Sequence, residues 1–133
     1  MSNNSRVGPL RVALVVVGII FIVGVYPLTI LWPSGWIWHM SGHSTYLQMI
    51  LGIYATLGVF LLLAARDPLK NLSLIWFTVW SSIVHGGIMA VQSLVYPEHR
   101  GHLLGDVPAL LLIAIVLAAL TPRGGETGAQ ASA

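Results

Sequence analysis

The chain has 133 residues, of which 56% are hydrophobic and 8% are charged, whereas a soluble domain carries about a quarter charged residues. A soluble domain of this length could not bury so much apolar surface, because small domains leave a large share of their area facing solvent. The net charge of +2 comes from basic residues at segment ends, not from a run that could follow phosphates, so nucleic-acid binding is not expected. No cysteine is present, which excludes disulfides and thiolate ligands.

Four apolar stretches are each long enough to cross a bilayer, which takes about 20 residues. They cover roughly 12–31, 46–65, 72–95 and 103–120. We therefore predict an all-α protein, a four-helix transmembrane bundle formed by one membrane domain at 12–122. A cytoplasmic segment 1–11 precedes it, and a disordered cytoplasmic tail 123–133 follows. A secretory signal peptide is the competing interpretation of the N-terminus, but the apolar run is long for a signal core and no small-x-small cleavage site follows.

Local patterns predict where the spans begin and approach each other. The segment 32–43 separates spans one and two, because its Pro, Ser and Gly residues break helices. Its tryptophans are typical interface anchors; they are Trp32, Trp36 and Trp38. Span two opens with Thr45-Tyr46-Leu47-Gln48, a capping-box pattern in which Gln48 would reach back to the Thr45 amide. Glycines without a side chain could allow close helix contact, or could simply reflect ordinary glycine frequency; they are Gly18, Gly24, Gly52 and Gly58.

Basic residues predict the orientation, since short loops rich in Lys and Arg stay cytoplasmic. Arg100 lies alone on one side, and the other side carries Arg6, Arg11, Arg66, Lys70 and Arg123. We therefore expect a multi-pass protein of the inner (cytoplasmic) membrane, with both termini in the cytoplasm. Loops 32–45 and 96–102 would then be periplasmic or exterior.

That topology gathers a histidine-rich cluster on the exterior face. Its members are His39, His43, Glu98, His99 and His102. Residues four apart, such as His39 and His43 or His102 and Asp106, share a helix face and could converge on a divalent metal such as zinc or copper. The alternatives are ordinary interface histidines in polar loops and a protonation role, because imidazole titrates near neutral pH.

Asp106 is the acidic residue that could lie inside a span, and two geometries fit it. If the helix begins at Asp106, this residue is an N-cap and Pro108 lies in the first turn. If the helix begins near Pro97, Asp106 is a membrane-embedded carboxylate that needs a partner, and Pro108 kinks the helix.

His85 lies near the middle of span three, on a polar stripe that should face the bundle interior. The stripe comprises Thr78, Ser81, His85, Met89 and Gln92. An intramembrane histidine suggests a site, here a proton acceptor, a ligand contact or the partner of Asp106. Gln48 or Tyr54 of span two could complete the network. The structural alternative is an interior histidine that holds helices together.

Four segments carry a family resemblance: Tyr46-Leu47-Gln48-Met49-Ile50-Leu51-Gly52-Ile53-Tyr54, Ala65-Arg66-Asp67-Pro68, Ser82-Ile83-Val84-His85 and Glu98-His99-Arg100-Gly101-His102-Leu103-Leu104-Gly105-Asp106. With these segments the chain resembles an uncharacterised family of small bacterial four-span membrane proteins that is distantly DoxX-like in layout. The resemblance covers most of 38–123 and implies a four-helix bundle of bacterial origin. It implies no established reaction.

Two function classes follow. The first is a non-enzymatic membrane protein, either an accessory subunit of a membrane complex or homo-oligomer, or a binder of a small ligand or metal. Its ligand-binding candidates are Gln48, Tyr54, His85, Gln92 and Asp106. The second is a small membrane enzyme or quinone-linked redox factor in which His85 and Asp106 handle protons. We favour the first, because no nucleophile motif, phosphate loop or pair of catalytic carboxylates is evident.

Overall fold

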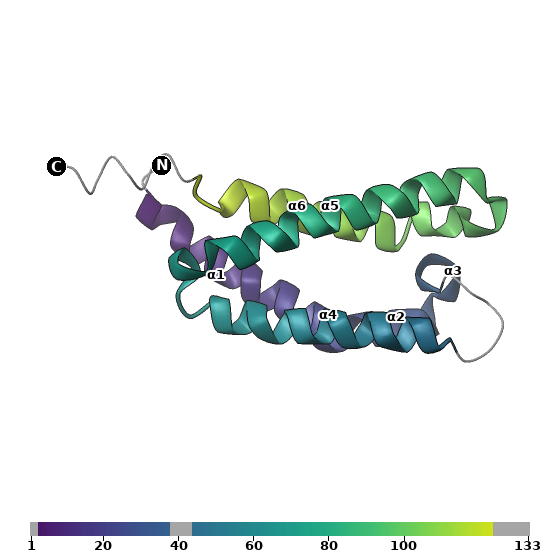
Figure 1. The fold of residues 1–133 in the computed structure, drawn as a ribbon, viewed down its shortest axis with the longest axis horizontal. Coiled ribbons are helices and arrows are strands. Elements are labelled where there is room, and N and C mark those ends of the chain that lie inside the picture. Colours follow the sequence, from purple (N-terminus) through teal and green to yellow (C-terminus); the bar gives the residue numbers. More distant parts are fainter. Residues whose placement is uncertain (1–2, 38–43, 124–133) are drawn as a thin grey trace.

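The computed structural model describes residues 3–37 and 44–123, and every regular element within those ranges is helical (Figure 1). Four candidate membrane spans follow one another: Ser5–Leu31, Thr45–Ala64, Pro68–Val95 and Pro97–Leu120. Each is long and apolar enough to cross a bilayer. The predicted all-α, four-helix bundle is therefore confirmed.

Most of the apolar surface of these helices points out of the bundle. Only 17% to 33% of the apolar window of each span is buried inside the protein. Large side chains such as Val12, Ile53 and Leu112 are 64%, 69% and 61% exposed. An apolar surface of this extent would cause association in water, whereas lipid tails cover it without penalty.

The first span is not one regular helix. It consists of α1 (Asn3–Ile19), a π-helical turn η1 (Ile20–Gly24) and α2 (Val25–Leu31). Turns of this kind are rare and often lie near functional sites. Here the turn buries Phe21, whose ring meets the Tyr54 ring edge-on at a centroid distance of 4.9 Å. The single turn α3 (Pro33–Trp36) follows α2.

The second span, α4 (Thr45–Ala64), begins with a serine cap. The capping box predicted at Thr45 is wrong by one residue, because Ser44 is the N-cap and its hydroxyl accepts a hydrogen bond from the Leu47 N–H at 3.1 Å. Serine and threonine are both favourable N-cap residues, so residue type alone does not decide between positions 44 and 45. Gln48 is exposed on the helix surface.

Replacing Ser44 by alanine should lower the free energy of unfolding by about 1 kcal/mol, because the Leu47 amide loses its acceptor. Thr45→Ala is the matched control and should have almost no effect, since residue 45 is already inside the helix. Unfolding in detergent by titration with dodecyl sulfate, followed by circular dichroism, would measure both. A larger loss in the Thr45 variant would instead favour the cap expected from the sequence.

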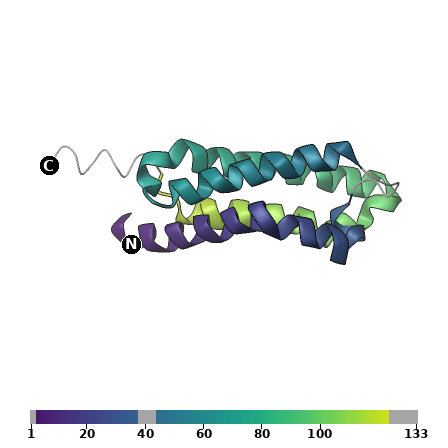
Figure 2. The same ribbon diagram turned by 90° about the horizontal axis from the view of Figure 1, so that it is seen from below.

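The second half of the chain forms two antiparallel helices with a 3₁₀ segment before each. These are η2 (Pro68–Asn71), α5 (Leu72–Val95), η3 (Pro97–Leu103) and α6 (Asp106–Leu120). α5 packs along α6, and α1 packs along α4, as Figures 1 and 2 show. The beginning of α1 and the end of α6 lie at the same end of the bundle as η2 (Figure 1). We call the opposite end, which carries α3 and η3, the α3 end.

The bundle is closed at the η2 end and looser at the α3 end. The core near η2 contains Leu10, Leu14, Leu61, Ile75 and Leu117, all 0% exposed. α4 and α5 approach each other near η2 and separate toward the α3 end (Figure 1).

The backbones of α1 and α4 meet at a glycine crossing. A Cβ atom on Gly58 would lie 2.6 Å from the Gly18 carbonyl oxygen, and one on Gly18 would lie 2.9 Å from the Gly58 carbonyl oxygen. Only glycine permits helices to come this close. By contrast, a Cβ atom on Gly52 of the same α4 would have nothing within 4 Å.

Candidate functional site

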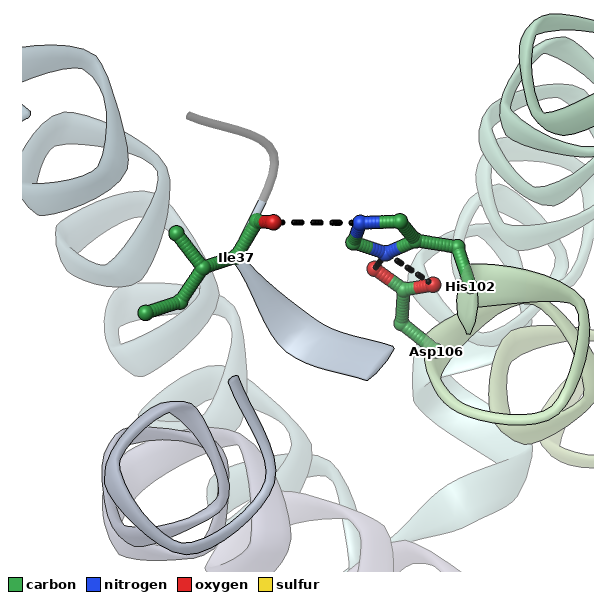
Figure 3. A network of polar contacts seen from close by, with 3 residues as sticks. All are labelled: Ile37, His102 and Asp106. Atoms are coloured by element: carbon green, nitrogen blue, oxygen red, sulfur yellow. Dashed lines mark hydrogen bonds and ion pairs between the residues drawn. The ribbon is translucent and has the colours of Figure 1, made fainter. Parts of the chain in front are cut away.

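A buried histidine–aspartate pair lies at the α3 end, where η3 leads into α6 (Figure 3). Both carboxylate oxygens of Asp106 lie 3.0 Å from Nδ1 of His102, and Nε2 of His102 lies 3.1 Å from the carbonyl oxygen of Ile37. His102 is 1% exposed and Asp106 is 7% exposed. His102 and Asp106, which are four residues apart in the sequence, are therefore in direct hydrogen-bonding contact.

These contacts determine where the protons lie. The Ile37 carbonyl oxygen can only accept, so Nε2 of His102 carries a hydrogen and donates it. The contact between Nδ1 and the carboxylate needs one further proton, which belongs to an imidazolium ion or to a carboxylic acid. The pair is neutral as a whole in either form. Mutual neutralisation is how two ionisable groups are tolerated away from water.

Asp106 combines the two geometries considered for it. α6 begins at Asp106, and Pro108 lies in its first turn, where a missing N–H is tolerated. The N-cap, however, is Gly105 and not Asp106. The carboxylate is buried, as expected for an embedded acid, and its hydrogen-bonded partner is His102.

Two glycines place this pair directly against α3. A Cβ atom on Gly101 would collide with the backbone of Ser34, and one on Gly105 would collide with the carbonyl of Gly35. The close backbone contact brings the Ile37 carbonyl within reach of His102, although the two residues are far apart in sequence. α3 and η3 therefore form a single cap over the α3 end.

His85 and Tyr54 form a second polar pair, deeper in the bundle. The Tyr54 hydroxyl oxygen lies 2.5 Å from Nδ1 of His85, and the two rings stack with their centroids 5.8 Å apart. Within the described ranges, Nε2 of His85 makes no hydrogen bond. If the phenol donates to Nδ1, Nε2 carries a hydrogen; if Nδ1 donates, the phenol hydrogen is available. The pair therefore offers one donor to its surroundings in either tautomer.

Two adjoining cavities meet at His85. The outer cleft, of about 410 Å³, lies between α4 and α5. It is open at the surface, because Tyr46, Ile88 and Tyr96 in its walls are 72%, 53% and 51% exposed. The inner cavity, of about 110 Å³, lies inside the bundle between η1, α4, α5 and α6. Four residues line both: Leu47, Ile50, His85 and Met89.

The residues expected to bind a ligand are distributed unequally over these cavities. Gln92 lines the outer cleft, Tyr54 and Asp106 line the inner cavity, and His85 lines both. Gln48 lines neither of them. On the polar stripe of α5, Thr78 and Met89 are buried and Ser81 and His85 are partly buried, whereas Gln92 is exposed. Most of the stripe therefore faces the bundle interior, and its last residue, Gln92, faces the outer cleft at the α3 end.

The described members of the predicted metal cluster do not form a ligand set. His39 and His43 lie outside the described residues. Among the residues that the structure does describe, no group of three or more His, Asp or Glu side chains could hold a metal ion. Both ring nitrogens of His102 are engaged, and His99 packs edge-on against Tyr96 and His102. Binding of zinc or copper stays a prediction.

Two cavity residues are not evident from the sequence. Phe21 lies in a uniformly apolar run, so the hydrophobic periodicity of the sequence does not predict the π-helical turn. That turn places the Phe21 ring against Tyr54. Trp36 has the sequence context of an interface anchor, but it lines the inner cavity. Its indole Nε1 is fully buried and has no hydrogen-bond partner among the described residues.

Fold and site together define a multi-pass membrane protein with a ligand-sized cleft in a four-helix bundle. The chain belongs to a family of unknown function, DUF6632, which matches residues 5–132. No curated protein and no solved structure matches the chain significantly. The family match carries no information on a bacterial source or a DoxX-like layout.

Proposed function

We propose that this protein is a non-enzymatic membrane protein that binds a small amphipathic molecule in the outer cleft. The observation that carries the proposal is a cavity of about 410 Å³ that is open between α4 and α5 and ends at His85. Its size falls in the range of about 300–1,000 Å³ that small-molecule sites occupy.

The lining of the cleft supports a ligand that is mostly apolar. Ile37, Leu47, Ile50, Ile88 and Met89 form its walls. The residues with polar groups lie at two levels. His85 is at the inner end, and those near the α3 end are Ser44, Tyr46, Gln92, Tyr96 and His99. An apolar pocket with a few convergent polar groups is the usual form of a site that orients one end of a ligand.

The route into the cleft leads sideways from the bilayer. Ile50 and Ile88, which line it, lie within candidate spans and are 42% and 53% exposed, so the cleft opens within the apolar part of the bundle. Basic residues are concentrated at the η2 end, which supports cytoplasmic termini and an inner-membrane location. In that orientation the ligand enters from the outer leaflet.

The other candidate functions have less support. A proton-handling or quinone-linked enzyme would need a direct proton path between His85 and Asp106. The two side chains line the same cavity and interact electrostatically, but their hydrogen-bond partners differ, Tyr54 for His85 and His102 for Asp106. A role as an accessory subunit or homo-oligomer requires a protein partner that covers part of the apolar surface, and a lipid bilayer covers the same surface equally well.

Blocking the cleft tests the proposal. Ile50→Trp places a large ring in the wall shared by the two cavities. Wild-type protein purified in mild detergent should retain a small lipophilic molecule that mass spectrometry detects in its organic extract. The amount per mole of protein should fall at least about tenfold in the variant, which corresponds to about 1.4 kcal/mol of lost affinity.

The matched control is Val59→Trp, on the same helix and 47% exposed, away from both cavities. It adds the same ring to the lipid-facing surface and should retain the wild-type amount. Equal retention by all three proteins, or by none, would contradict a ligand site in the cleft.

A further inference from the structure

We propose that the inner cavity receives the end of the ligand that carries an uncharged carbonyl-type oxygen, and that this oxygen accepts a hydrogen bond from the Trp36 indole N–H. This inference rests on the proposed function, because the ligand reaches the inner cavity through the outer cleft. It adds the chemical class of the ligand, a lipophilic carbonyl compound, and a residue that selects it.

The Trp36 indole carries the argument. Its Nε1 is buried without a hydrogen-bond partner among the described residues, and the indole can only donate. A buried donor left unpaired is unfavourable, and such groups are rare in folded proteins. Trp36 lines the inner cavity. Nε1 itself has almost no surface open to the empty cavity, so the indole would turn to meet an acceptor there, and the new hydrogen bond would satisfy the donor.

The charges around the cavity select a neutral acceptor. Asp106 lines the same space, but its pair with His102 is neutral as a whole, so the wall offers no net charge that would bind an anionic or a cationic group. A charged group on the ligand would therefore lose its hydration here without compensation. Most of the remaining wall is apolar, with Phe21, Leu110 and Ile113 among its members. A carbonyl oxygen on an apolar skeleton matches this environment.

The size of the cavity limits what can enter it. A volume of about 110 Å³ is close to that of a cavity that holds one benzene ring. The inner cavity can therefore take the carbonyl-bearing end of a ligand, while the rest lies in the outer cleft. The Tyr54–His85 pair, which lines the inner cavity, can supply a second donor at greater depth. Ordered water is the competing occupant, because Asp106, His85 and Tyr54 are polar enough to hold it.

The test compares probes that differ only in the acceptor. Protein labelled with ¹⁵N-tryptophan has five indole resonances, and the one lost in Trp36→Phe belongs to Trp36. The first probe pair is 2-acetylnaphthalene and 2-isopropylnaphthalene, a free ketone and its hydrocarbon analogue. The second is a short-chain phospholipid with ester linkages and its ether analogue. In each pair only one member has a carbonyl group.

We expect a carbonyl probe to shift the Trp36 indole proton downfield and to bind about tenfold more tightly than its analogue. Trp36→Phe should abolish that preference, whereas Trp80→Phe, an exposed residue of α5, should preserve it. Thermal melting should show both variants folded. A response to the ketone pair alone identifies a free lipophilic carbonyl compound, and a response to the ester pair alone identifies a membrane lipid; either supports the inference.

Other results separate this inference from the function on which it rests. If both members of a pair bind equally and Ile50→Trp blocks them, the cleft binds ligands but Trp36 does not select a carbonyl, and the inference is wrong. The inference is also wrong if the Trp36 proton instead shows contact with water that no probe displaces. If no probe binds to the wild-type protein, both the inference and the proposed function are contradicted for ligands of this kind.

Discussion

Replacing Asp106 by leucine should lower the free energy of unfolding by about 3–5 kcal/mol, because removal of one member of a buried ionisable pair leaves the other without the partner that neutralises it and hydrogen-bonds to it. In the folded protein His102 would keep its hydrogen bond to the Ile37 carbonyl but lose both contacts to the carboxylate. Without the carboxylate the imidazole ring is no longer held in position, so its bond to Ile37, which joins η3 to the segment after α3, should weaken and the cap over the α3 end should loosen as well. Titration with dodecyl sulfate in detergent micelles would measure the loss.

Two control variants show whether the loss of stability in Asp106→Leu comes from the lost hydrogen-bonded pairing or from the lost charge. In Asp106→Asn the amide nitrogen can donate to Nδ1 of a neutral His102 while Nε2 still donates to Ile37, so most of the stability should remain. Lys70→Ala breaks the ion pair of Lys70 with Asp67, whose side chains are 83% and 48% exposed. Its effect should be about 0.2–1 kcal/mol, as for other exposed pairs. An Asp106→Leu variant as stable as Lys70→Ala would show that the buried pair does not stabilise the fold.

Gly58→Ala should destabilise the protein by about 1–3 kcal/mol, the usual range for an overpacked contact. The new methyl group would lie 2.6 Å from the Gly18 carbonyl oxygen and 3.1 Å from the Phe21 Cβ atom. Backbone atoms cannot rotate away, so α1 and α4 would have to separate. Because Phe21 packs against Tyr54, this separation should also weaken ligand retention in the cavities.

Gly52→Ala is the matched control for this crossing, since it makes the same change in the same helix where nothing lies within 4 Å. Alanine has the higher helix propensity, so this variant should be unchanged or more stable by up to about 1 kcal/mol. Unfolding measured under identical conditions would compare the two. Equal effects at positions 52 and 58 would contradict a close crossing.

Much of the fold could be predicted because each span is a local property of the chain. A run of about 20 apolar residues must cross the bilayer as a helix, since no water is present to bond the backbone. The predicted helix boundaries are less accurate where two adjacent residues could both serve as the N-cap. Ser44 and Thr45 can both cap a helix, and Ser44 does so because its hydroxyl reaches the Leu47 amide.

The site could be predicted only in part, because some of its contacts depend on the exact residue at which a helix begins. The position of His85 on the interior stripe of α5 follows from helical periodicity, and its pairing with Tyr54 was among the expected networks. The partner of Asp106 was harder to choose, because it depends on where α6 begins. A start at Asp106 after the turn at Leu104 and Gly105 turns its carboxylate toward His102.

The sequence by itself determined the class of this protein: an apolar chain with four stretches that must be helical in a bilayer, and an interior histidine in the third. Only the tertiary structure decided which groups meet. The contacts of His102 with Ile37, of Phe21 with Tyr54 and of Gly18 with Gly58 join segments far apart in the chain. Such contacts depend on how helices pack, and hydropathy cannot predict them because it reports how apolar a span is and not which of its faces meets a neighbour.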